Sequence, residues 1–239
     1  MLKIENVEIA GFGPALRGMR NPKNSWDRSD SFMCEGLPYG DCKNESDCEN
    51  ADDCCNGFRM GPNDLKLAET LADGGPVHAK YRRMIIVWLD ITAPLYWWKE
   101  FDTYKVGTVA NSCSTMHKIG EKKFTMDDFS VEHLVTDGTL LMNDIIRALN
   151  NIRDIYLDFD HLRDQGDLIP ELTCKKDVWW QMIQLLPSSY NQKRTVMLSY
   201  EVLANIYKWR RNHKLYEWHV ICDWIESLPY SDLITGIRG

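Results

Sequence analysis

The chain has no long run of apolar side chains. Its longest uninterrupted run, Met84–Leu89, is far shorter than the about 20 residues that a membrane-spanning helix needs. The start of the chain also lacks the basic residues followed by an apolar stretch that mark a secretory signal. We therefore expect a cytoplasmic protein with no membrane partner.

Basic residues are too few to give the chain a positive surface. The sequence holds 28 Lys and Arg against 35 Asp and Glu, a net charge of −7. Duplex nucleic acid is bound mainly through Lys and Arg that neutralise phosphates, so it is not an expected partner. The acid excess is confined to the segment from Ser29 to Cys55, which has eight acidic residues and one Lys. The rest of the chain is close to neutral.

The cysteines lack the two-residue spacing of a zinc ribbon, and their cluster contains no His. Five of the eight lie in the acidic segment: Cys34, Cys42, Cys48, Cys54 and Cys55. Disulfides are rare in the cytoplasm, which leaves free thiols or a metal site. We expect an acidic Cys-rich insertion over residues 29–59 with no bound metal. A zinc site is the alternative.

Internal repeats and low-complexity linkers are also absent. A chain of 239 residues with 44% hydrophobic and 11% aromatic residues can bury a sizeable core. The simplest partition is one α+β domain over residues 1–239 that carries the insertion.

Residue patterns predict a mostly α-helical fold with a small β-sheet. Weak alternation of apolar residues from the start to about Leu16 indicates a strand, and Met84–Ile91 favours another. Asn63 or Asp64 is expected to cap one helix, and Pro94 to begin another that ends at Gly107. The expected helices cover residues 65–72, 94–107, 137–157, 176–186, 190–212 and 215–228, with a capped turn at 125–128.

One stretch, Thr92–His117, joins an aromatic-rich helical pattern to a loop of hydroxyl, thiol, amide and imidazole groups. Apolar bulk before such a loop gives rigid support, and short polar side chains leave room for a ligand. The stretch is a candidate binding site. The alternative is a well-packed helix followed by an ordinary turn.

Arg210 falls on a largely apolar face of the expected helix 190–212, in register with Leu203 and Val196. A buried guanidinium needs an anion, which favours a ligand there. The alternative is that Arg210 complements the negative helix C-terminus and reaches water.

The residues after the Leu-Pro at 186–187 resemble the flavin-dependent thymidylate synthases, which methylate dUMP with FAD, a reduced nicotinamide and methylenetetrahydrofolate. In that family the following helix bears an Asn, an Arg, a flavin-contacting Asn or His, and an Arg that grips the nucleotide. These places fall on Ser199, Glu201, Asn205 and Arg210. The last two agree with the family and the first two do not.

The family's signature loop, N-E-x-S-x-R-Y, resembles residues 111–117, where Asn111 and Ser114 match. Before it, Lys99-Glu100-Phe101 resembles an Arg-Gln-aromatic helix end, so Glu100 takes a substrate-binding place. The family's RHR triplet is lost, and only Lys105 keeps a charge there.

Two further segments carry the resemblance. His78 resembles a His that precedes the family's strand-to-helix passage, and residues 213–218, HKLYEW, resemble its HAQWEI segment.

The resemblance implies an enzyme of reductive one-carbon transfer. FAD contacts are expected at His78, Lys105, Asn111 and Asn205. Contacts with a dUMP-like pyrimidine deoxynucleotide are expected at Glu100, Ser114 and Arg210, the last two being the catalytic residues. The family also implies a homotetramer, with NADPH and methylenetetrahydrofolate as co-substrates.

The lost arginines would each have made a charge-assisted contact worth about 1.5 to 3 kcal/mol. Either the pocket binds a different nucleotide, or Lys105, Lys193 or Arg194 supplies the charge. The alternative function is a non-catalytic or regulatory nucleotide-binding protein on the same fold.

Cys113 and His117 lie four residues apart in the same loop. A thiolate beside an imidazole could add to C6 of a pyrimidine. The favoured interpretation is a small residue that packs under the loop, with a hydrogen-bonded His nearby.

Overall fold

The computed structural model describes residues 2–33 and 58–237, which divide into two compact units. Unit 1 comprises residues 1–3, 91–102 and 111–194, and unit 2 comprises residues 4–90, 103–110 and 195–239. The expected single domain with its insertion stays a prediction.

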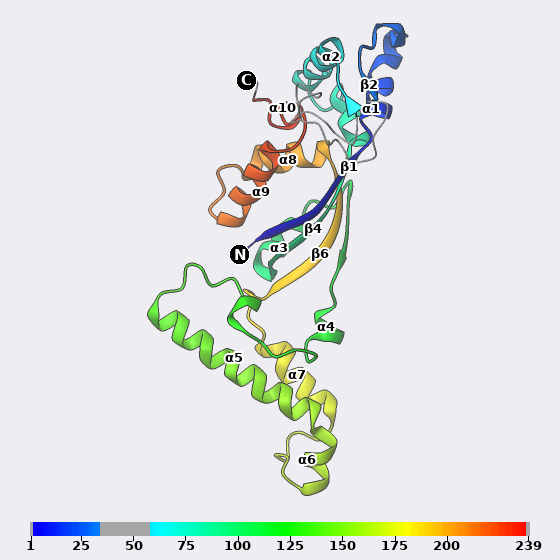
Figure 1. The fold of residues 1–239 in the computed structure, drawn as a ribbon. Helices are drawn as coiled ribbons and strands as arrows, with labels where there is room; N and C mark the ends of the chain where they lie inside the picture. The colour runs from blue at the N-terminus through cyan, green and yellow to red at the C-terminus, as the bar shows by residue number, and fades with distance from the viewer. Residues whose placement is uncertain (1, 34–57, 238–239) are drawn as a thin grey trace, which may run out of the picture. The chain divides into compact units, whose positions relative to one another are not determined.

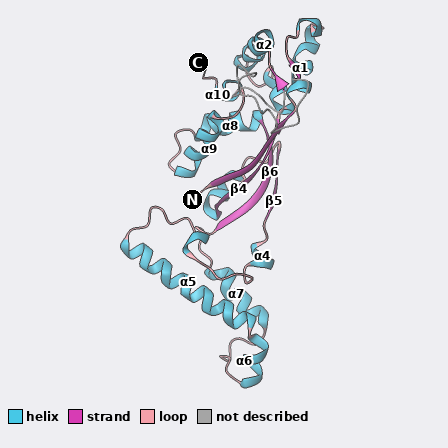
Figure 2. Cartoon of the chain, viewed as in Figure 1, coloured by secondary structure: helices cyan, strands magenta, loops and turns pink. Residues whose placement is uncertain are grey.

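A four-stranded sheet has the order β1 (Lys3–Ala10), β4 (Ile86–Pro94), β6 (Asn191–Ser199), β5 (Thr108–Ser112). Strands are drawn in magenta in Figure 2. In unit 2 the amide of Tyr200 donates to the carbonyl of Ile85 at 3.0 Å, and in unit 1 the amide of Leu95 donates to Tyr190 at 3.0 Å. The end of β6 therefore meets the start of β4, and these two strands are antiparallel.

Unit 2 surrounds its part of the sheet with helices. They are α1 (Phe12–Arg20), α2 (Pro62–Asp73), α8 (Tyr200–Arg210), α9 (Tyr216–Glu226) and α10 (Asp232–Thr235), with 3-10 turns η1 (Asn21–Lys23), η2 (Trp26–Arg28) and η4 (Ala79–Met84). Helix α8 packs against η4, α9 and α10, and the three C-terminal helices form one group in Figure 1. Leu203, Ile206 and Trp218 are almost fully buried there. Burial of side chains of this size contributes about 1.5 to 3 kcal/mol each.

A buried carboxylate ties the start of α2 to the chain after α1. Asp64 is fully buried, and its oxygens accept hydrogen bonds from Arg20 Nε at 2.5 Å and from the hydroxyls of Ser29 and Ser31 at 2.6 Å each. Neither Asn63 nor Asp64 caps the helix, which corrects the expectation: the N-cap is Gly61. The Asp30 carboxylate accepts from the first-turn amides instead.

Unit 1 holds the remaining helices. They are α3 (Leu95–Phe101), α4 (Thr115–Lys118), η5 (Met126–Asp128), α5 (Thr136–Leu157), α6 (Phe159–Gln165) and α7 (Lys175–Leu185). Helices α5 and α7 pack side by side (Figure 1). Side chains of both helices contribute to a core of Ile119, Phe124, Phe129, Met142, Leu149 and Met182.

Most expected elements are confirmed. The helices at 65–72, 137–157, 176–186 and 215–228 and the capped turn at Thr125 occur within a few residues of their expected bounds. A strand does open the chain, but it ends at Ala10, and the last residues of the expected strand lie in α1 instead. The α+β class with a small sheet is likewise confirmed.

The expected helix 190–212 is wrong in its first half, because residues 191–199 form β6. Burial alternates there, with Gln192, Val196 and Leu198 buried, and the strand pairs with neighbours from distant parts of the chain. The helix expected to end at Gly107 instead ends at Phe101.

The acidic Cys-rich insertion lies almost entirely outside the described residues. Its described ends, β2 (Phe32–Met33) and β3 (Phe58–Arg59), pair as an antiparallel ribbon. Within the described ranges no group of His, Cys, Asp and Glu could hold a metal ion. No described helix is long and apolar enough to cross a membrane.

Candidate functional site

A cavity of about 1000 Å³ in unit 2 lies along α8, and we call it the α8 cleft. It is lined from four directions: by α2 and the turn after it, by η4 with the start of β4, by the loop before β5, and by α8 with α10. Its size is at the upper end of the range for small-molecule and cofactor sites. The cleft is therefore the candidate site.

Cations outnumber acids on the walls of the α8 cleft. Its charged lining residues are Arg82, Arg83, Lys208 and Arg211 against Asp73 and Glu201. In a chain whose net charge is −7, this local excess marks the cleft as a place for an anion.

Asn205 lies on the exposed side of α8 and lines the α8 cleft. At the start of the same helix, the Ser199 hydroxyl accepts from the amide of Val202 at 3.4 Å and caps the helix. Gly107 faces this turn at a φ of 79°, where a Cβ would lie 3.3 Å from Val202 Cγ2. A glycine therefore lets the loop approach the helix closely.

A smaller hollow of about 500 Å³ shares Asn205, Val106 and Val202 with the cleft and is also lined by Lys105 and Arg210. The structure thus brings three of the expected ligand-binding residues together in unit 2. They are Asn205, which has an amide side chain, and the cations Lys105 and Arg210. Lys105 is exposed and Arg210 is half-buried.

The Arg210 side chain is held between two aromatic rings. Its guanidinium carbon lies 4.7 Å from the centroid of the Trp218 ring and 5.6 Å from that of Tyr104, and its Nε donates to the Tyr104 hydroxyl at 2.9 Å. Cation–π contacts and a hydrogen bond fix the direction of this charge. The apolar face inferred for Arg210 is here an aromatic clamp.

His78 occupies a different cavity of unit 2 from Asn205. Its ring packs near Gly74, where an added Cβ would lie 3.1 Å from Cδ2. The structure does not place His78 on the α8 cleft or on the adjoining hollow. Its role as a flavin contact stays a prediction.

Glu100, Asn111 and Ser114 belong to unit 1. Asn111 is exposed on β5, and Ser114 caps α4 by accepting from the amide of His117 at 3.1 Å. Glu100 is half-buried in α3. Their roles in ligand binding stay predictions from the resemblance.

Arg194, one candidate to replace the lost triplet, is already engaged within unit 1. Its guanidinium carbon lies 4.2 Å from the centroid of the Trp98 ring, and it donates to Asp102 at 2.7 Å and to Gln192 at 3.0 Å. An ion pair and a stacked ring hold this charge in place, so it is a poor replacement for a ligand-binding arginine.

Cys113 is tied to β6 through its backbone. Its amide donates to the carbonyl of Lys193 at 2.9 Å, and its carbonyl accepts from Gln192 Nε2 at 3.0 Å. In the described part of the chain no hydrogen bond joins the Cys113 thiol to the His117 ring. Both contacts use backbone atoms of Cys113 and its side chain is exposed, so the structure does not show the thiol packed under the loop.

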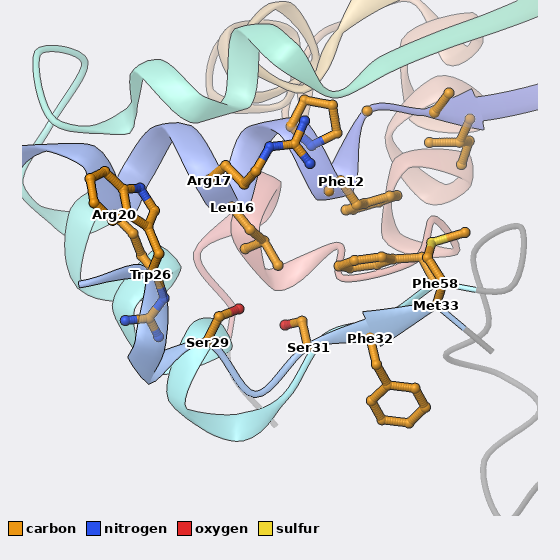
Figure 3. A pocket seen from close by; sticks show the side chains of 15 residues that line it. Phe12, Leu16, Arg17, Arg20, Trp26, Ser29, Ser31, Phe32, Met33 and Phe58 are labelled. Atoms are coloured by element: carbon orange, nitrogen blue, oxygen red, sulfur yellow. The ribbon is translucent and has the colours of Figure 1, made fainter. Parts of the chain in front are cut away.

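Unit 2 has another, more apolar cavity of about 490 Å³ beside α1 (Figure 3). Phe12, Leu16 and Phe58 form its inner wall, and the Phe12 and Phe58 rings stack at 5.6 Å. Figure 3 shows the hydroxyls of Ser29 and Ser31 facing it from the opposite side. None of the residues expected from sequence to bind a ligand lines this cavity.

Sequence reasoning missed three cations of the α8 cleft. Arg82 and Arg83 are an Arg pair directly before a predicted strand, which was a usable signal. Lys208 is in helical register with Glu201 and Asn205, a pattern typical of a solvated stripe. Only the folded chain places η4 against α8 and so brings these charges to one cavity.

No family model matches the sequence, and no curated protein matches it. Solved structures match through their fold, and the class they define is flavin-dependent thymidylate synthase. Two such structures are of the enzyme ThyX from Helicobacter pylori with FAD and dUMP. They have TM-scores of 0.60 and 0.59 and identities of 14% and 13%, and each match covers 98% of this chain and 97% of the other. The chain therefore has the fold of flavin-dependent thymidylate synthase, as the resemblance implied.

Proposed function

We propose that the protein binds FAD and a dUMP-like pyrimidine deoxynucleotide and catalyses a reductive one-carbon transfer. The observation that carries this proposal is the α8 cleft, a cofactor-sized cavity with Asn205 on one wall and an excess of cations. It occurs in a chain with the fold of enzymes solved with those two ligands. Fold by itself does not define function, so the proposal rests on the residues of the cleft.

The residues of the cleft suit FAD. Its phosphates need cations, and Arg82 carries a buried Nε that makes no hydrogen bond within the described chain. The polar part of a flavin needs amide or hydroxyl partners, which Asn205 and Ser199 can provide. Gly107 leaves open space where a side chain would crowd the start of α8.

Three side chains have distinct parts in the proposal. Asn205 hydrogen-bonds the cofactor from the exposed side of α8. Lys105 lines the adjoining hollow as an exposed ammonium and attracts the negative ligand. Arg210 holds the nucleotide, because Tyr104 and Trp218 fix its guanidinium and leave less side-chain entropy to lose on binding.

When bound and reduced, FAD supplies the hydride for the transfer. The protein's own work is to bind and orient the ligands, since none of its described groups is needed as a nucleophile in this scheme. NADPH and methylenetetrahydrofolate are proposed as co-substrates, and four copies of the chain as the assembly. Light scattering of the purified protein tests the assembly.

A non-catalytic nucleotide-binding protein is the second candidate. Lys105 is the sole cation left at the place of the RHR triplet, and Arg194 is held by Asp102 and Gln192. A cleft that keeps cations for binding but lacks those of the RHR triplet would bind a nucleotide without catalysing its conversion.

Two measurements separate the candidates. The first is FAD binding by the purified protein, followed by the flavin absorbance that stays with it after gel filtration. The second is formation of dTMP from dUMP with NADPH and methylenetetrahydrofolate. Bound flavin with product supports the enzyme, and nucleotide binding without flavin or product supports the second candidate.

A further inference from the structure

Two cations of the α8 cleft have no acidic partner within the described residues, and a third has only a long, exposed contact with one. Within the described residues Arg82 and Lys208 form no ion pair, and the Lys208 ammonium lies 5.0 Å from the centroid of the Trp209 ring. The nearest carboxylate oxygen to Arg83 belongs to Glu201, at 3.9 Å, and the Arg83 side chain is 59% exposed. These three charges are available to a ligand.

We infer that Arg82, Arg83 and Lys208 bind the diphosphate of a nucleotide cofactor and replace the cationic triplet missing from residues 103–106. This inference rests on the proposed function, because it names the groups that hold the cofactor in the same cleft. It moves the phosphate-binding charge from the loop before β5 to η4 and α8.

Arg211, the fourth cation of the cleft, is excluded from phosphate binding because it is already paired with two carboxylates. Arg211 donates to Asp223 at 2.9 Å, and its Nε lies 3.2 Å from a Glu226 oxygen. Two carboxylates already balance this guanidinium, which therefore offers little charge to a phosphate. With Arg211 set aside, the cleft has three cations, Arg82, Arg83 and Lys208, against two acids, Asp73 and Glu201. Its net charge is positive only when all three cations are counted.

The three cations come from elements that are fixed against each other. Helix α8 packs on η4, and the hydrogen bond from the Tyr200 amide to the Ile85 carbonyl joins the start of α8 to the end of η4. A phosphate group bound between them meets charge from both sides without a large rearrangement. Arg82 also lines the cleft, and its Nε is buried without a hydrogen bond within the described chain.

The test measures the affinity of the full chain for FAD and for ADP, which has a diphosphate and no flavin. The variants are Arg82→Met with Arg83→Met, and Lys208→Met alone. Lys80→Met is the matched control, because Lys80 is on η4 yet lines another cavity. Lys208 is exposed, so its loss is not expected to disturb folding, and circular dichroism checks each variant.

Each charge removed is expected to weaken ADP and FAD binding roughly tenfold or more, with a weaker salt dependence than the unaltered protein, while Lys80→Met changes neither. ADP binding that needs these cations supports the inference even if FAD fails to bind, a result that contradicts the proposed function. FAD binding that is equal in folded variants and unaltered protein overturns the inference and leaves the proposed function intact. Failure to bind either ligand overturns both.

Discussion

Arg210 donates a hydrogen bond from its Nε to the hydroxyl of Tyr104 at 2.9 Å. Trp218 covers the guanidinium from the next helix, at 4.7 Å from its ring centroid. The residue that the resemblance assigns to the nucleotide is thus itself oriented by two aromatic side chains. This arrangement links the loop at residues 103–107 to α8 and α9.

We predict that Arg210→Ala weakens dUMP binding by at least a hundredfold, a loss of about 2.7 kcal/mol or more, and lowers the free energy of unfolding by no more than about 1 kcal/mol. Calorimetric titration and urea denaturation measure the two effects. Tyr104→Phe is the matched control, since it keeps the ring and removes only the hydrogen bond. If Arg210→Ala costs as much in unfolding free energy as in binding free energy, Arg210 is structural.

Stability is predicted to fall in acid partly through Asp64. Burial by itself raises the pKa of this carboxyl, but hydrogen bonds from Ser29, Ser31 and Arg20 outweigh it and hold the pKa below its ordinary 3.8. A carboxyl with a lower pKa in the folded chain stabilises it above the unfolded value, and that contribution disappears as the pH falls through the folded value.

Asp64→Asn is expected to lower the unfolding free energy at neutral pH by about 3 kcal/mol, because it leaves Arg20 buried beside a neutral group. The variant should also lose less stability than the unaltered protein between neutral pH and about pH 3. Urea denaturation across that range measures both. Parallel pH curves for the two proteins would show that Asp64 titrates normally.

Cys113→Ser is predicted to leave dTMP formation within about twofold of the unaltered rate, because Cys113 holds β6 through its backbone atoms. A steady-state assay with dUMP checks this. Abolished turnover in a folded Cys113→Ser protein would instead establish a thiolate mechanism.

Gly107→Ala is predicted to cost more stability than Gly75→Ala. Both glycines have positive φ, 79° and 86°, so each alanine suffers a backbone strain of about 1 to 2 kcal/mol. Only at Gly107 would the added Cβ also crowd Val202, since nothing lies within 4 Å at Gly75. Equal losses in urea denaturation would show that Val202 yields without cost.

The sequence predicts the elements that local pattern specifies. Apolar spacing alone places α5, α7 and α9 within a few residues of their bounds, and the box of Thr125 and Asp128 marks η5. Prediction from local pattern fails at β6, because this strand is followed directly by α8 with no Gly or Pro between them. Pairing with strands from distant parts of the chain decides the structure there. Helix α1 is missed because the expected strand continues to about Leu16, over the residues that form the first half of this helix.

The residues of the candidate site divide in the same way, into those that a sequence pattern predicts and those that only the folded chain brings together. Asn205 and Arg210 come from a resemblance within one helix, and the structure places both beside one hollow with Lys105. Arg82 and Lys208 share a cavity only because η4 packs against α8. No local pattern encodes that contact, so the chain alone shows Arg82 and Arg83 as an Arg pair before a strand but not that they share a cavity with Lys208.

Titration of the purified chain with FAD tests the central claim most directly. Quenching of flavin fluorescence would be compared between the unaltered protein and Asn205→Leu, with the exposed Asn212 changed to Leu as control. We predict saturable binding of FAD that Asn205→Leu weakens at least tenfold and Asn212→Leu does not change. Absence of saturable binding by the folded, unaltered protein, or equal binding by Asn205→Leu, would contradict an FAD site in the α8 cleft.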